Sequence, residues 1–224
     1  MGNFQKNNNL IGSIAYHGQV ALTGCVTGEL YAWNGTTLTK SVGKNHSKLI
    51  DAITVTSQDI FTGGRDAKIC VLNPANYAVK ATFNCTEGLP GTVSGAVRAI
   101  SFDSSMNALY VGTFGHEIYK VGFQTGSKRF AQTGTNLIKG HYAPLVQDNN
   151  ECWGLATNPS KANFVATVSD DSTLRLWDVQ RHIELLCVKF DKNIKGDKIP
   201  VDPKTKEAAH STMGRAVDVS PDGS

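Results

Sequence analysis

Hydrophobic and polar residues alternate along this chain in short segments, and no segment of useful length repeats its apolar residues with the period of an α-helix. Alternation over about four to eight residues is typical of β-strands that bury one face. Glycine and proline, 22 and 7 in number, separate the segments and indicate turns. The pattern therefore predicts an all-β protein, with candidate strands VALTGC (20–25), TLTKSV (37–42), LIDAITVT (49–56), DIFTGG (59–64), AVKATFN (78–84), VRAISFD (97–103), LYVGTF (109–114), KRFAQT (128–133), CWGLATN (152–158), FVATVS (164–169) and IELLCVKF (183–190).

The strand pattern repeats along the chain, with a large apolar residue at the equivalent place of each repeat. These anchors are Trp33, Leu72, Val121 and Trp177, at spacings of 39, 49 and 56 residues. Repeats of about 40–45 residues that contain four short strands are typical of WD β-propellers, in which one repeat forms one blade. We therefore predict WD-repeat β-propeller blades at approximately 10–43, 44–91, 92–134 and 135–191.

The last residues, GRAVDVSPDGS (214–224), predict the first strand of a further blade. A propeller of the WD type has more blades than four, and an open propeller exposes unpaired strand edges. We therefore expect about four blades and the start of another, as part of a larger propeller.

One repeat contains a dense polar segment, SDDSTLRLWD (169–178), which follows the dipeptide Gly140-His141. A serine, a histidine and an aspartate are the residues of a hydrolase triad, but no serine of the chain lies in a GxSxG elbow. In WD repeats the same residue types resemble a hydrogen-bonded relay within one blade. The residues of the predicted relay are His141, Ser169, Asp171 and Trp177.

The second repeat favours the relay over the triad. It has His46 and Asp66 at equivalent positions, but Gly64 stands in place of the serine. A scaffold tolerates this replacement, whereas a catalytic centre does not. We therefore assign these residues a structural role and predict that the protein is not an enzyme and has no catalytic residues.

Composition and charge argue against several other classes of function. The formal net charge of +3 is too small to define a partner. The five cysteines form no CxxC pair and the six histidines no HxH or HxxxH pair, so we predict reduced core thiols and no metal or cofactor. Basic residues do not alternate with aromatic ones, and no apolar run approaches the roughly 18 residues of a membrane helix. We therefore predict neither a nucleic-acid nor a membrane partner.

The order of the repeats resembles that of the echinoderm microtubule-associated protein-like (EMAP-like) family. A tryptophan repeat without the aspartate is followed by a repeat that has it, then by a degenerate repeat, and finally by a repeat that begins with Gly-His. The segments that carry the resemblance are LTGCVTGELYAWNG (22–35), GGRDAKICVLN (63–73), VRAISF (97–102), LYVGTFGHEIYKV (109–121), IKGHYAPLVQDNNECWGLATNPS (138–160), VSDDSTLRLWD (168–178) and RAVDVSPDGS (215–224). The resemblance implies a tandem propeller pair and a non-catalytic scaffold that binds tubulin or microtubules.

The resemblance also implies a cytoplasmic location on the cytoskeleton, at microtubules or the axoneme. The alternative is a generic WD propeller that binds other proteins or peptides through its loops and is not specific for tubulin.

A lysine-rich loop at 192–213 is a candidate contact for such a partner. Between residues 189 and 206 the chain holds six lysines and three aspartates, a local charge of +3. Such a segment can attract an acidic microtubule surface, although charge on a long loop also serves solubility alone. The possible contact residues are Lys189, Lys192, Lys195, Lys198, Lys204 and Lys206.

Overall fold

Four antiparallel sheets make up the fold of the protein, for which a computed structural model describes residues 9–141, 152–190 and 214–223. The first sheet contains β1 (Ile11–His17), β2 (Val20–Cys25), β3 (Glu29–Asn34) and β4 (Thr37–Lys44). The second contains β5 (Ile50–Val55), β6 (Ile60–Gly64), β7 (Lys68–Leu72) and β8 (Val79–Asn84). The third contains β9 (Val97–Asp103), β10 (Ala108–Thr113), β11 (Glu117–Gln124), β12 (Arg129–Phe130) and β13 (Thr135–Lys139). The fourth contains β14 (Cys152–Thr157), β15 (Phe164–Ser169), β16 (Thr173–Asp178) and β17 (Ile183–Lys189).

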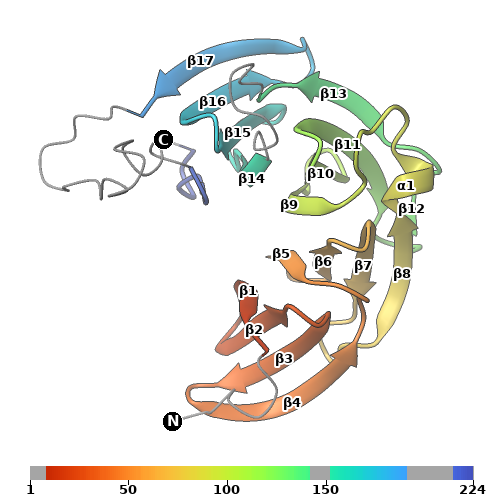
Figure 1. Cartoon of the computed structure of the whole chain (residues 1–224). Helices are drawn as coiled ribbons and strands as arrows, with labels where there is room; N and C mark the ends of the chain where they lie inside the picture. Colours follow the sequence, from red (N-terminus) through yellow and green to blue (C-terminus); the bar gives the residue numbers. More distant parts are fainter. Residues whose placement is uncertain (1–8, 142–151, 191–213, 224) are drawn as a thin grey trace, which may run out of the picture.

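The sheets are the blades of a propeller. Figure 1 shows them side by side in an arc, with β1, β5, β9 and β14 on its inner side and β4, β8, β13 and β17 on its outer side. A single helical turn, α1 (Cys85–Gly88), follows β8. None of the helices in the described part of the chain is long and apolar enough to cross a membrane. The predicted all-β propeller fold is confirmed.

The hydrophobic cores lie between neighbouring blades rather than within them. Along β6, Ile60 packs in a cluster shared with the first blade, and the next residue, Phe61, packs in a cluster shared with the third. On β10, Leu109 packs in the cluster shared with the second blade, and Tyr110 packs in a cluster shared with the fourth. Successive side chains of a strand point to opposite faces, so β6 and β10 are buried at every position. Packing of each blade therefore depends on its neighbours.

The outer edge of the third blade differs from the sequence prediction. In place of a strand over 128–133, β12 covers only two residues and pairs with the end of the eight-residue β11. The start of β11 pairs with β13 instead. Between the two short strands the chain leaves β11, and the Gly134 N–H donates to the Gly88 carbonyl at 2.7 Å. A strand of this length has more backbone groups to pair than β12 can satisfy. The third sheet therefore includes β13 as a second short outer strand.

The inner strands surround a cavity of about 790 Å³, which residues 215–219 also line. These residues lie beside β14, since a Cβ atom on Gly154 would come within 3.0 Å of the backbone of Ala216 and Val217. This is where the inner strand of a further blade would lie, but residues 214–220 form no strand. The predicted further blade and the predicted blade limits stay predictions.

Four of the five cysteines, Cys25, Cys70, Cys85 and Cys152, are buried, as expected for core thiols. Cys187 is exposed, which corrects the prediction for that residue. It lies on β17, the outer strand of the fourth blade, all seven residues of which are exposed.

Candidate functional site

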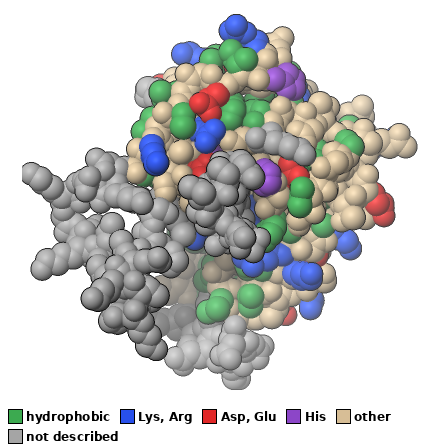
Figure 2. Space-filling view, turned by 45° about the horizontal axis from the view of Figure 1, so that its top comes forward, with side chains coloured by type: hydrophobic (Ala, Val, Ile, Leu, Met, Phe, Trp, Pro, Cys, Tyr) green, Lys and Arg blue, Asp and Glu red, His purple; other side chains and the backbone are tan. Residues whose placement is uncertain are grey.

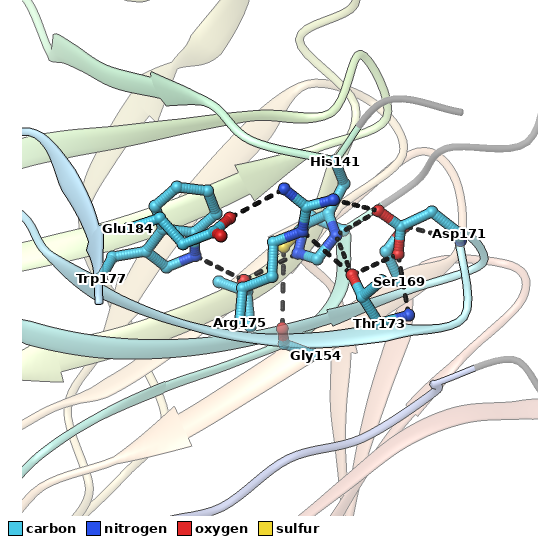
Figure 3. A network of polar contacts seen from close by, with 10 residues as sticks. His141, Gly154, Ser169, Asp171, Thr173, Arg175, Trp177 and Glu184 are labelled. Atoms are coloured by element: carbon cyan, nitrogen blue, oxygen red, sulfur yellow. Dashed lines mark hydrogen bonds and ion pairs between the residues drawn. The ribbon is translucent and has the colours of Figure 1, made fainter. Parts of the chain in front are cut away.

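A hydrogen-bonded relay joins His141, the β15–β16 turn and β16 within the fourth blade (Figure 3). The Nδ1 atom of His141 lies 2.9 Å from Asp171 Oδ2, and its Nε2 atom lies 2.7 Å from the Thr167 hydroxyl. The Trp177 indole donates to the same hydroxyl at 2.8 Å. Because a carboxylate can only accept, Nδ1 carries the proton, and in the neutral ring the Thr167 hydroxyl donates to Nε2. One buried threonine thus connects the indole to the imidazole.

Thr167 takes the place that was predicted for Ser169. Both side chains point to the same face of β15, but Val165 is the residue opposite Trp177 in the strand register. The indole therefore reaches Thr167, two residues along the strand, and does not reach Ser169, which is four residues away. The Ser169 hydroxyl instead accepts the Asp171 N–H at 3.3 Å and stabilises the turn.

A recurring spacing in the sequence points to this threonine. In the first, second and fourth blades a threonine precedes the anchor by ten residues, as Thr23, Thr62 and Thr167. The Trp33 indole donates to Thr23 at 3.0 Å, which repeats the contact of the fourth blade. The sequence prediction missed this signal because it followed the serine next to the turn.

The second blade contains the same relay without the indole. His46 Nδ1 lies 2.9 Å from Asp66 Oδ1, and His46 Nε2 lies 2.8 Å from the Thr62 hydroxyl. Gly64 leaves room for this pair, since a Cβ atom there would lie 2.5 Å from His46 Nδ1. Because Thr62 supplies a hydroxyl to His46, the glycine at position 64 does not by itself argue against a catalytic triad in this blade. The stronger argument is that both His46 and Thr62 are buried.

The third blade lacks the relay aspartate and uses a glutamate two residues further on. Gly115 stands at the aspartate position, and a Cβ atom there would lie 2.5 Å from Glu117 Oε2. Glu117 is fully buried and accepts hydrogen bonds from the Thr113 hydroxyl, the Thr92 hydroxyl at 3.2 Å and the Val93 N–H at 2.7 Å. A carboxylate therefore occupies the turn here too, although it comes from a different position in the sequence.

The first blade repeats this substitution. Thr27 stands at the aspartate position, and its hydroxyl donates to Glu29 at 2.7 Å. The Asn9 amide also donates to Glu29, at 2.7 Å. The hydrogen bond from Thr27, with that from Asn9, holds the pKa of Glu29 below its usual range against the opposing effect of burial. Each of the four blades thus places a carboxylate at the same turn.

The His46–Asp66 pair makes stability depend on pH. Burial disfavours the charged imidazole, but the hydrogen bond to Asp66, the interactions with Cys70 and the charge of Asp66 together outweigh it and raise the pKa of His46 to about 9. A raised pKa contributes stability that is complete below the unfolded value of about 6.5 and is lost as the pH rises toward 9. We expect the free energy of unfolding to fall by up to about 3 kcal/mol over this range, measured by urea unfolding at a series of pH values.

The variant Asp66→Asn removes the largest of the interactions that raise the pKa of His46 and should flatten the decline between pH 6.5 and 9. The pKa of Asp66 itself is lowered, because hydrogen bonds from His46 and from the Ser47 N–H overcome the effect of burial. Its own contribution is therefore present above about pH 4 and is lost as the pH falls. An unchanged decline in Asp66→Asn would assign the pH dependence to other groups.

A second set of side chains lines one end of the cavity. Near its start each inner strand has a β-bulge, which turns one side chain out of the alternation. The inner row is our name for the bulged residue of each inner strand together with Arg215, which lies at the corresponding place beside β14. It consists of Gly12, Asp51, Arg98, Trp153 and Arg215, all of which line the cavity.

Contacts along the inner row connect one blade to the next. Arg98 Nη1 donates to Asp51 Oδ2 at 2.6 Å, between the third and second blades. The Arg98 guanidinium lies 4.5 Å from the centre of the Trp153 ring, and the Arg215 guanidinium lies 4.2 Å from it. Cation–π contacts of this kind favour a fixed stacking geometry. The row is therefore a continuous chain of contacts over three inner strands and the segment beside them.

In the second, third and fourth blades, the turn residue that precedes the relay aspartate position contacts the inner row. Arg65 Nε donates to Asp51 Oδ2 at 2.8 Å, and the Phe114 ring lies 4.9 Å from the Arg98 guanidinium. In the fourth blade the Trp153 indole donates to Asp170 Oδ2 at 2.8 Å, and Arg215 forms an ion pair with Asp170 at 3.4 Å. We call Arg65, Phe114 and Asp170 the turn row. The two rows position arginines and aromatic rings at the end of the cavity.

Metal ligands and buried thiols can be assessed within the described residues. Within ranges 9–141, 152–190 and 214–223, no three His, Cys, Asp or Glu side chains are arranged to hold a metal ion. Burial raises the pKa of the Cys85 and Cys152 thiols to about 12, so both are neutral near pH 7 and are poor nucleophiles. The arginines and rings of the two rows are instead suited to recognition.

The predicted lysine contacts lie outside the described residues, except for Lys189 at the end of β17. Lys189 is exposed. Figure 2 shows Lys and Arg side chains at separate places on one face, with acidic and apolar side chains between them. Charge among the coloured residues of that face therefore does not single out one contact surface.

Comparison with known proteins supports the class that this geometry defines. No protein-family model matches the chain. The chain is 25% identical over 203 residues to the ciliary WD repeat-containing protein ctxp80 of Euplotoides octocarinatus, a match that covers 91% of the chain and 25% of that protein. It is 30% identical over 165 residues to echinoderm microtubule-associated protein-like 2 of Mus musculus, covering 72% of the chain and 22% of that protein. A chain in a crystal structure of the mitotic checkpoint complex has a TM-score of 0.62 at 15% identity, over 83% of this chain and 54% of that one.

The four blades, with the relays of the second and fourth, define a WD-repeat β-propeller region. The chain is a distant homologue of the EMAP-like proteins and of a ciliary WD-repeat protein, which confirms the resemblance seen in the sequence. It spans about a quarter of the length of these relatives.

Proposed function

We propose that the chain is part of a non-catalytic scaffold that associates with microtubules or tubulin, in the cytoplasm at the cytoskeleton or axoneme. The observation that carries the proposal is the 30% identity over 165 residues to a relative that is named as microtubule-associated. The similarity to a ciliary protein over 91% of the chain agrees with a place at the axoneme.

The geometry supports the non-catalytic part of the proposal. The residues that resemble a hydrolase triad, His141 and Ser169, are fully buried, and the hydroxyl nearest to the imidazole belongs to Thr167. A buried, hydrogen-bonded set of this kind stabilises a fold and is not accessible to a substrate. We therefore assign the relays to stability and the partner contacts to the loops and rims.

Co-sedimentation with polymerised microtubules across a salt series tests the proposed function. We expect the protein to pellet at low salt, and less so when salt is raised or when the acidic tubulin tails are removed, because screening weakens contacts between exposed charges. Charge reversal at Lys192, Lys195 and Lys198 should reduce pelleting if the lysine-rich loop takes part. Absence of binding to both microtubules and soluble tubulin at low salt would contradict the proposal.

The second candidate function is a protein- or peptide-binding module that is not specific for tubulin. The inner row favours it, because arginines and aromatic rings at the end of a cavity are suited to recognition whether or not tubulin is the partner. A partner that stays bound after tubulin is removed would support this function.

A further inference from the structure

We propose that the outer strand of the fourth blade is a dimer interface, at which β17 pairs antiparallel with β17 of a second copy of the chain. Such a pair has a two-fold axis and joins the two fourth sheets into one continuous sheet. The proposal concerns the assembly of the chain with itself, so it goes beyond microtubule association and does not depend on it.

β17 presents a free and apolar edge. One edge of the strand pairs with β16, and among the described residues no strand pairs with the other (Figure 1). All seven residues of β17 are exposed. Its large apolar side chains keep 37% to 49% of their surface exposed, and they are Ile183, Leu185, Leu186 and Val188. Such an edge is a template for another strand, because pairing satisfies backbone groups and removes apolar surface from water.

The outer strands of the other blades have features that protect a sheet edge. β4 has two shifts in its register with β3 and contains Lys40 and Lys44. β8 has one such shift and contains Lys80. The third blade divides its edge between β12 and β13, which cover two and five residues. Lysines, bulges and short strands prevent edge-to-edge pairing. β17 has a bulge only near its start and no charge in the run LLCV (185–188).

The backbone direction of β17 limits how two copies can pair. Phe190, directly after the strand, donates its N–H to the Ser172 carbonyl at 2.8 Å on the β16 side. In an antiparallel sheet the backbone groups of successive residues point to opposite sides, so those of Lys189 and Cys187 point outward. An outward residue must face an outward residue of the second copy. A pairing centred on Cys187 meets this condition, because the two copies of Cys187 then exchange two hydrogen bonds.

Charge selects this pairing among those that the backbone allows. β17 has Glu184 near one end, Lys189 at the other, and no further charged residue. When the pairing is centred on Cys187, Lys189 lies opposite Leu185 of the second copy and next to its glutamate, and this contact occurs twice around the axis. A centre at Val188 would move Lys189 away from Glu184, and a centre at Lys189 would place two lysines opposite each other. The edge is therefore complementary to itself.

The same pairing brings apolar side chains together. Leu186 lies opposite Val188 of the second copy, on the sheet face that both share with Leu174 and Leu176 of β16. Apolar residues directly opposite each other on neighbouring strands stabilise a sheet. A contact between two single strands is small for a protein–protein interface, so we expect a dimer that dissociates on dilution.

Sedimentation velocity of the full chain over a series of concentrations tests the proposal. We expect monomers at low concentration and dimers at high concentration. Leu186→Lys should raise the dissociation constant about tenfold, because the two-fold axis counts each lost apolar pair twice. Leu38→Lys is the matched control, since Leu38 lies on the outer strand β4 and is 45% exposed, against 49% for Leu186. It should dimerise as the wild type does.

Cross-linking with a short bifunctional maleimide identifies the strand that makes the contact. Cys187 is the one exposed cysteine of the five, and the pairing places its two copies opposite each other. We expect a cross-linked dimer from the wild type, in a yield that follows the dimer fraction found by sedimentation. Cys187→Ser should give none, and Leu186→Lys should give much less.

Three results would overturn the proposal: a chain that stays monomeric at all concentrations, equal dissociation constants in Leu186→Lys and Leu38→Lys, or a dimer that does not cross-link through Cys187. If Leu186→Lys fails to fold, Lys189→Glu decides, because it changes an exposed strand end and adds a repulsion with Glu184 at each end of the interface. An unchanged dimer in Lys189→Glu would then contradict the pairing. Dimerisation without microtubule binding would sustain this inference and contradict only the proposed function.

Discussion

The variant Thr167→Val will lower the free energy of unfolding by about 2–4 kcal/mol, because it leaves two buried polar groups without their partner. Valine has nearly the same shape as threonine and fills the same space. It cannot accept the Trp177 indole N–H or hydrogen-bond to His141 Nε2, both of which lie within 2.8 Å of the Thr167 hydroxyl. Urea unfolding monitored by circular dichroism measures the loss.

Ser169→Ala is the matched control for this prediction. Ser169 lies on the same face of β15 and is equally buried, but its hydroxyl accepts one long hydrogen bond, from the Asp171 N–H at 3.3 Å. We expect it to cost less than about 1 kcal/mol. A larger effect for Ser169→Ala than for Thr167→Val would restore the serine to the relay and contradict the arrangement described above.

The variant Glu117→Leu will destabilise the protein by about 2–4 kcal/mol, although no sequence motif marks this residue. Its side chain is fully buried, and its carboxylate accepts from two hydroxyls and the Val93 N–H. Leucine fills the space but leaves that N–H without an acceptor. Chemical unfolding of the variant, compared with the wild type, gives the size of the effect.

Two further variants separate the hydrogen bonds of Glu117 from its volume. Glu117→Gln keeps one carbonyl oxygen for the Val93 N–H and should recover much of the lost stability. Glu29→Leu removes the equivalent glutamate of the first blade, which is only partly buried, so water can replace its contacts and the loss should be smaller. Equal stability of Glu117→Leu and the wild type would show that this carboxylate does not replace the relay aspartate.

The strands were predictable because alternation and turn residues are local properties. β5, β6, β9, β10, β14 and β15 all lie where the sequence places them, within a few residues at each end. The split outer edge of the third blade was not predictable, because it depends on how β12 and β13 share β11. Pairing between strands is a tertiary property, which the alternation of a single segment does not record.

The relay was predictable in part for the same reason. Spacing from the anchors identified Asp66 and Asp171, and the upstream Gly-His position of WD repeats identified His46 and His141, which meet these aspartates at the turn. Only the strand register shows that the indole reaches Thr167 rather than Ser169. The inner row escaped sequence reasoning altogether, since a bulge becomes visible only when two strands are aligned in space.

The β-bulge at the start of each inner strand also bears on how such a propeller can diversify. At this one geometric position four successive blades carry a glycine, an aspartate, an arginine and a tryptophan: Gly12, Asp51, Arg98 and Trp153. The flanking residues Val97 and Cys152, by contrast, are buried and apolar. The fold thus accepts very different side chains at a position that faces the cavity while it holds the neighbouring positions to the core. Duplicated blades can therefore acquire new binding partners through one substitution per blade, without a change in the packing that holds them together.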